Sequence, residues 1–179
     1  MKKYRKYIIS VSMIDRMPQT DMTLRNIATC MAEHFTEEDN EYPRGHDGLD
    51  TKTHFNAIVT VGDNANDLGD PLVEELRRGF GIVGISHIPA RKDPETDDIH
   101  IVDRITEGMA AVVLDDTCTN SGDIEAAMVA FRARAIQETG FKHDESHRAR
   151  VVGAVALFHP SDNDERQLSD GITIHRVGA

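Results

Sequence analysis

The stretch "VVLDDTCTNSGDIEAAM", residues 112–128, contains the pattern that decides the fold of this chain. An apolar run stops at two adjacent carboxylates, Asp115 and Asp116, and a segment of small polar residues follows. A helix is expected to begin next, with Asp123 available as its N-cap. Two carboxylates between a buried strand and a small-residue loop favour a ligand site. A plain strand-to-helix turn capped by Asp123 is the alternative.

The same alternation of apolar runs and helical patterns extends to both sides of this stretch. Strands are predicted from the apolar runs, and helices from apolar residues at helical spacing. The expected strands are 7–12, 56–62, 82–88, 99–102, 109–116, 150–160 and 171–177, and the expected helices are 20–35, 71–81 and 123–140. Strands that alternate with helices predict an α/β fold, with a mostly parallel central sheet and helices on both faces.

Two loops are expected at the carboxyl ends of the strands, where ligands bind in such sheets. One covers residues 62–70 and the other residues 115–123. Small residues in the second loop allow several backbone N–H groups to converge, and the helix that follows adds its dipole. The second loop is therefore a candidate phosphate site. Asp115 and Asp116 are placed to accept hydrogen bonds from sugar hydroxyls or to hold a hydrated cation.

Composition narrows the classes of function. The chain has 179 residues, which suits one domain with a real core, and 39% of them are hydrophobic. Its formal net charge of −11 argues against general binding to nucleic acid. We find no uninterrupted apolar run of the length that a membrane span requires. Two cysteines do not make a disulfide framework, so we expect a reducing, cytoplasmic location.

The segment "VVLDDTCTNSGD", residues 112–123, resembles the phosphoribosyl-diphosphate (PRPP) binding motif of type I phosphoribosyltransferases. The resemblance implies Mg²⁺-dependent transfer of ribose 5-phosphate from PRPP to a nucleobase or similar nitrogen nucleophile, with release of pyrophosphate. It also implies a homodimer. The chain would be a single domain with a core at about 55–160 and a base-covering hood from about 1–54, with 160–179 as a further candidate for the hood.

The resemblance also assigns roles to residues. Asp115 and Asp116 would contact the ribose hydroxyls and hold Mg²⁺ through water. The 5-phosphate would be bound by Thr119, Asn120, Ser121, Gly122 and Asp123. Pyrophosphate would lie against Gly62, Asp63, Asn64, Ala65 and Asn66. Residues 89–107 would form a mobile flap, in which Arg91 and Lys92 reach the pyrophosphate as catalytic residues.

Two features depart from this family. Asp123 stands where the family usually has Thr or Ser, and an ionised carboxylate only accepts hydrogen bonds. A phosphate would be repelled unless a cation intervened. In addition, Asp63, Asp67 and Asp70 make the expected pyrophosphate loop acidic. These departures leave open a non-catalytic regulator that binds PRPP or a nucleotide on the same fold.

Other patterns indicate weaker alternatives. The segment "VTVGDNANDLGD", residues 59–70, is similar to the last motif of haloacid-dehalogenase-type phosphatases, but the Asp-x-Asp nucleophile motif of those enzymes does not precede it. His143 and His147 have the spacing of a metal-binding pair on a helix, without an obvious third ligand. Cys118 lies inside the candidate phosphate loop, where we interpret it as a filler rather than a nucleophile.

Overall fold

The computed structural model describes residues 20–35, 55–116, 122–139, 149–156, 165–167 and 173–176. The predicted strand at 7–12 lies outside these residues, and so do the His143–His147 pair and Cys118. Three residues assigned to the 5-phosphate, Thr119, Asn120 and Ser121, also lie outside the described residues.

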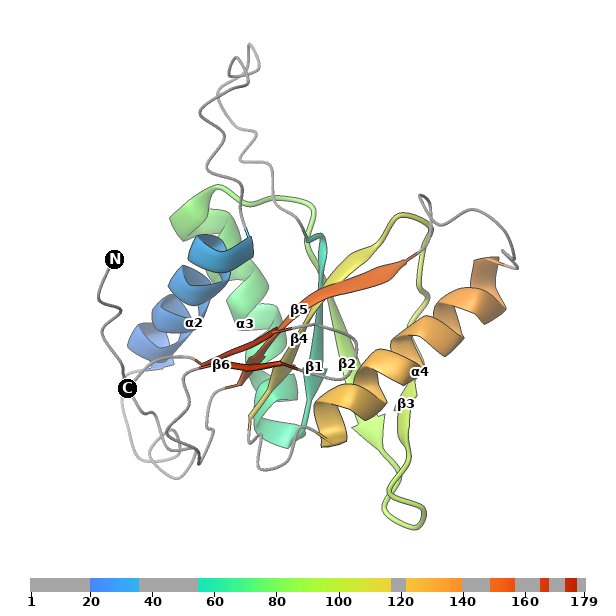
Figure 1. Ribbon diagram of the computed structural model, residues 1–179. Coiled ribbons are helices and arrows are strands. Elements are labelled where there is room, and N and C mark those ends of the chain that lie inside the picture. Colours follow the sequence, from blue (N-terminus) through green and yellow to red (C-terminus); the bar gives the residue numbers. More distant parts are fainter. Residues whose placement is uncertain are drawn as a thin grey trace.

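A mixed, mostly parallel sheet forms the centre of the fold (Figure 1). Its strands are β1 Ala57–Val61, β2 Ser86–Lys92, β3 Ile99–Ile101, β4 Ala110–Asp115, β5 Arg150–Ala156, β6 Glu165–Gln167 and β7 Thr173–Arg176. Their order across the sheet is β3-β2-β1-β4-β5-β7-β6. The four inner pairings are parallel, and only β3 and β6 at the two edges pair antiparallel. The predicted α/β fold is confirmed.

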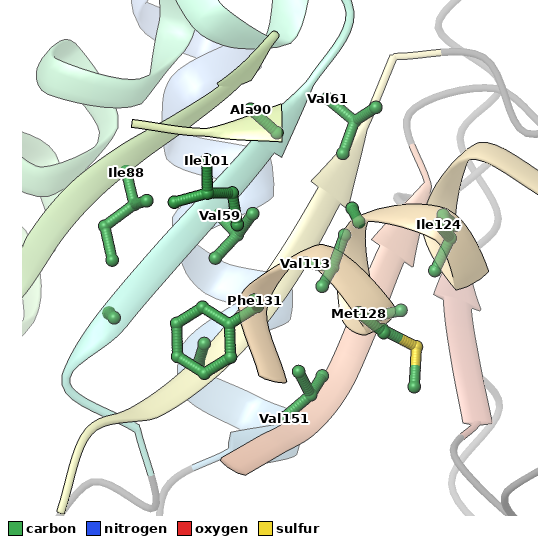
Figure 2. Close-up of a cluster of buried hydrophobic side chains, with 14 of the residues drawn as sticks. Val59, Val61, Ile88, Ala90, Ile101, Val113, Ile124, Met128, Phe131 and Val151 are labelled. Atoms are coloured by element: carbon green, nitrogen blue, oxygen red, sulfur yellow. The ribbon is translucent and has the colours of Figure 1, made fainter. Parts of the chain in front are cut away.

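Helices cover both faces of the sheet (Figure 1). Helix α4, Gly122–Thr139, lies on one face, while α2, Thr20–Phe35, and α3, Asp63–Phe80, lie together on the other. Under α4, the side chains of Ile124, Met128 and Phe131 pack on Val59 and Val113 (Figure 2). Because both faces are covered, all residues of β1 and β4 are buried, which explains their nearly continuous apolar sequences.

The contact between α2 and β5 depends on a glycine. The ring of Phe35 lies against Gly153, so close that a Cβ at this position would overlap the ring. Phe35 also makes an edge-to-face contact with Phe55, at a centroid distance of 6.1 Å. The end of α2 is therefore held in the apolar cluster between the helices and the sheet.

The prediction that residues 62–70 form a loop was wrong, because α3 begins at Asp63, directly after β1. Pro71 was expected in the first turn of this helix but lies in its interior. Proline removes one helical hydrogen bond. The apolar residues Ala65, Leu68 and Leu72 nevertheless face the core at helical spacing, and their burial offsets that loss.

The strand predicted at 82–88 is shifted toward the C-terminus. Gly81 ends α3 in the left-handed region at φ 67°, and Gly84 has φ 75°, so residues 82–85 form a connection. Strand β2 then runs to Lys92 and pairs with β3. The first residues of the expected flap are therefore part of an ordered hairpin, and Arg91 and Lys92 lie in a strand.

The C-terminal segments extend the sheet. β7 pairs in parallel with β5, and β6, which the sequence did not predict, forms the edge beyond it. Among the described residues of 1–54, α2 packs on α3 and β5 and contributes to the core. A hood over a nucleobase stays a prediction.

Candidate functional site

The carboxyl ends of three parallel strands are aligned. Ala90 of β2, Val61 of β1 and Asp115 of β4 stand in one row across the sheet. The residues that follow them are Arg91, Gly62 and Asp116. The two segments that the sequence placed at this edge are therefore neighbours in space, and the basic end of β2 lies beside them.

Gly62 joins β1 to α3 and makes the closest approach between these segments. Its φ is 90°, a conformation that favours glycine, and a Cβ here would lie 2.7 Å from Oδ1 of Asp116. The side-chain amide of Asn64, in the first turn of α3, donates a hydrogen bond to Oδ2 of Asp116 at 3.2 Å. The carboxylate after β4 is thus held against the start of α3.

The adjacent aspartates have different surroundings. Asp115 is the last residue of β4 and is 3% exposed, whereas Asp116 is partly buried. Successive side chains of a strand point to opposite faces. Val113 belongs to the cluster under α4 and Leu114 to the cluster under α2 and α3. Asp115 is therefore directed toward the α4 side, and Asp116 toward α3.

The other basic residue of β2 contacts the start of α4. Lys92 Nζ lies 3.2 Å from Oδ1 of Asp123, and 3.6 Å from Oδ1 of Asp97 in the hairpin turn. The hydrogen bond from Lys92 to Asp123 and the charges of both carboxylates raise the pKa of Lys92. Asp123 lies within the first turn of α4, after Gly122, and not at the cap position. Lys92 therefore offsets part of the charge with which Asp123 would repel a phosphate.

The acidic residues of the 62–70 segment lie about one turn apart along one face of α3. Asp63, Asp67 and Asp70 recur along α3, so Asp70 stands about 10 Å from Asp63 along the helix axis. Only Asp63 remains at the helix N-terminus, where a carboxylate interacts favourably with the helix dipole. Asp70 therefore opposes an anion at this turn less than the sequence suggested, while Asp63 still opposes it.

The other two residues of the predicted pyrophosphate turn have internal roles. Ala65 is fully buried in the core. Asn66 donates to the carbonyl oxygen of Ala90 at 3.2 Å and accepts a hydrogen bond from Thr60 Oγ1 at 2.6 Å. Thr60 also contacts His87. Sequence reasoning missed Thr60 and His87, although a Thr inside the apolar run "AIVTV" was a detectable signal.

The described part of the chain contains few side chains that could bind a metal ion or act as a nucleophile. No group of three or more His, Cys, Asp or Glu side chains there could hold a metal ion. Two carboxylates and the Asn64 amide are nevertheless oxygen donors of the kind that Mg²⁺ accepts when a substrate supplies further oxygens. Burial raises the pKa of the Cys30 thiol to about 12, so this thiol is a poor nucleophile at neutral pH. Among the described helices, none has the length and apolarity of a membrane span.

Comparison with known proteins finds solved structures of similar architecture. No protein-family model and no curated protein matches the chain. An adenine phosphoribosyltransferase structure matches with a TM-score of 0.54 at 15% identity, over 92% of this chain and 83% of the other. The adenine phosphoribosyltransferase of Rhodothermus marinus matches at TM-score 0.50 and 15% identity, over 86% and 77%. The orotate phosphoribosyltransferase of Aeropyrum pernix matches at TM-score 0.50 and 14% identity, over 88% and 69%.

The chain is thus an α/β protein whose polar residues gather at the carboxyl edge of a parallel sheet. Its fold is that of the type I phosphoribosyltransferases, at 14–15% sequence identity to the structures compared. The resemblance seen in residues 112–123 is confirmed at the level of the fold.

Proposed function

We propose that this protein is a Mg²⁺-dependent phosphoribosyltransferase that transfers ribose 5-phosphate from PRPP to a ring nitrogen of a nucleobase. The observation that carries the proposal is the contact of Asp116 with Gly62 and Asn64. It brings Asp116, the second residue of the acidic pair, to the start of α3, at the edge where such sheets bind ligands.

Two helix N-termini support a ligand with two anionic groups. α3 begins directly after β1 and α4 begins seven residues after Asp115, so both helices start at the carboxyl ends of neighbouring strands. The dipole of each helix favours an anion at its start. We assign the pyrophosphate to residues 62–66 at the start of α3 and the 5-phosphate to the start of α4.

The residues present fit a magnesium ion that arrives with the substrate. Asp115 and Asp116 would hold it through water, because Mg²⁺ is usually bound by one or two carboxylates together with substrate phosphates. When bound, the ion would offset the negative charge of the leaving pyrophosphate.

The chain's own residues would perform two tasks. As pyrophosphate leaves, ribose C1 gains positive character, and the reacting atoms must be held in line. Asp115 and Asp116 would do this by accepting hydrogen bonds from the ribose hydroxyls. Arg91 and Lys92, at the end of β2, would neutralise the departing pyrophosphate.

A second candidate function is a regulator that binds PRPP or a nucleotide without turnover. The observation that favours it is the ion pair between Lys92 and Asp123. These two side chains neutralise each other at the position where the family usually has the hydroxyl of Thr or Ser. An ion pair of this kind reduces the positive charge that is available to stabilise a leaving group. It does not prevent a ligand from binding.

Calorimetric titration with PRPP, with and without Mg²⁺, tests the site. We expect Mg²⁺-dependent binding in the micromolar range. No binding of PRPP would refute the transferase, and a further failure to bind nucleotides would refute the regulator. Pyrophosphate release in the presence of a panel of bases then separates them. Adenine and orotate come first, because the similar structures are enzymes named for these bases. Binding without release with any base would favour the regulator.

A further inference from the structure

The two basic residues at the end of β2 point to opposite faces of the sheet. Successive side chains of a strand alternate between the two faces. Ile88 and Ala90 lie in the cluster under α4 (Figure 2). His87 lies on the other face, where its ring contacts α3. The same alternation places Arg91 on the α3 face and Lys92 on the α4 face.

A direct contact agrees with this direction of Lys92. Its Nζ lies 3.2 Å from Oδ1 of Asp123, in the first turn of α4. A side chain on the α3 face would be separated from α4 by the sheet itself. The side chain of Lys92 is 43% exposed, so a ligand at the start of α4 can reach its ammonium group from solvent.

The carboxylates after β4 are divided between the faces in the same way. Asp115 is directed toward α4, whereas Asp116 is held against the start of α3. Each face of the sheet edge therefore combines the start of one helix, one basic residue of β2 and one carboxylate. We call these groups the α3 half-site, with Gly62, Asn64, Arg91 and Asp116, and the α4 half-site, with Lys92, Asp115 and Asp123.

A ligand that matches both half-sites carries one anionic group for each face. PRPP has this form, because its pyrophosphate is on C1 of the ribose and its single phosphate is on C5. The ribose would then lie at the edge of the sheet, between the two helix starts. A phosphate at the start of α4 would meet the ammonium of Lys92 and not the guanidinium of Arg91.

We propose that Lys92 determines the specificity of the α4 half-site for a sugar with a terminal phosphate, while Arg91 alone serves the pyrophosphate in the α3 half-site. This inference rests on the proposed function and narrows it, since it moves Lys92 from the pyrophosphate to the 5-phosphate. An incoming phosphate competes with Asp123 for the ammonium of Lys92. Lys92 thereby distinguishes a phosphorylated sugar from an unphosphorylated one.

Arg91→Met and Lys92→Met are a matched pair of variants. Each removes one positive charge and keeps an unbranched apolar side chain in its place. Both positions are exposed at the end of β2, so we expect both proteins to fold, and thermal unfolding checks this. The two positions are neighbours in one strand, so a general change in the charge of the edge affects both variants alike. Lys92→Arg keeps the charge and tests for rescue.

Calorimetric titration with two separate probes, ribose 5-phosphate and Mg²⁺–pyrophosphate, tests the division. Lys92→Met should bind ribose 5-phosphate about 10-fold more weakly and Mg²⁺–pyrophosphate about 2-fold more weakly or less. Arg91→Met should show the reverse pattern, because free pyrophosphate carries the full charge of the leaving group. Lys92→Arg should bind ribose 5-phosphate about as well as wild type.

Two results would overturn the inference. One is a loss of Mg²⁺–pyrophosphate binding in Lys92→Met that equals or exceeds its loss of ribose 5-phosphate binding. The other is an equal effect of both variants on both probes, since the two faces would then not be distinguished.

The outcome for this inference is separable from the outcome for the proposed function. If the probes show the crossed pattern but PRPP gives no turnover with any base, the transferase fails and the two half-sites stand. If PRPP is turned over and the pattern is not crossed, only the role of Lys92 fails. If wild type binds neither probe, the half-sites and the proposed function both fail.

Discussion

Lys92 Nζ lies 3.2 Å from Oδ1 of Asp123, so an ion pair joins the last residue of β2 to the first turn of α4. Asp123 is the main departure of residues 112–123 from the phosphoribosyltransferase motif. The ion pair shows that the carboxylate does not stand alone at the proposed 5-phosphate position. It also engages Lys92, a cation that the proposed function assigns to the pyrophosphate.

Asp123→Thr should therefore tighten the binding of PRPP. The substitution removes a negative charge and releases Lys92, and we expect the Kd to fall about 5-fold at low salt, with a smaller change at high salt. Calorimetry at two salt concentrations measures this. Glu125→Gln removes a charge from the same turn of α4 and is the control. Weaker binding by Asp123→Thr would mean that the carboxylate itself contributes to the ligand site.

Gly62→Ala should weaken PRPP binding, in addition to its effect on the free energy of unfolding. The positive φ alone should cost about 1–2 kcal/mol in the free energy of unfolding. The new Cβ would in addition displace Asp116, from which it would lie 2.7 Å. Gly108→Ala is a matched control, since Gly108 has φ 73° and a Cβ added there would meet nothing within 4 Å. Equal losses of PRPP binding in both variants would contradict the role of the Gly62–Asp116 contact.

Asp116→Asn should weaken PRPP binding about 10-fold while the protein stays folded, because Asp116 is partly exposed at the edge of the sheet. Asp115→Asn should weaken binding as well, and it should also lower the melting temperature, since Asp115 is 3% exposed. Calorimetry and thermal unfolding measure the two effects. Wild-type affinity in either variant would refute a sugar contact for that residue.

Arg91→Ala should reduce turnover more than binding. Arg91 is exposed at the end of β2, and its proposed partner is the charge that develops on the departing pyrophosphate. We expect kcat to fall about 100-fold with a change in Kd of about 3-fold or less. Arg78→Ala, near the far end of α3, is the control for general loss of positive charge. Equal losses in kcat and affinity would argue against a transition-state role.

Gly153→Ala should destabilise the fold without touching the site. The added methyl group would overlap the ring of Phe35, and overpacking of this kind costs about 1–3 kcal/mol. Phe35→Leu in the same chain should recover part of the loss, because it removes the ring edge that the methyl group meets. Chemical denaturation of the two single variants and the double variant measures the coupling. Additive losses would show that the two residues do not interact.

Much of the architecture follows from short-range patterns. The continuous apolar runs around Val59 and Val113 mark strands buried on both faces, and the helix at 20–35 shows the spacing that its burial requires. The carboxylates at the end of β4 were located in the same way. Alternation of strands and helices then restricts the fold to a parallel sheet whose strand ends share one edge. These features are local, so the sequence determined them by itself.

Other features required the tertiary structure. α3 begins at Asp63 although Pro71 favours a later start, because burial of Ala65 and Leu68 against the sheet outweighs one lost hydrogen bond. The spacing of residues along the chain does not predict which side chains become hydrogen-bond or ion-pair partners across the fold. Lys92 and Asp123 are 31 residues apart, and His87 and Thr60 are 27 apart. Only the packing of helices on the sheet brings these side chains within hydrogen-bonding distance and thereby decides the charge balance of the site.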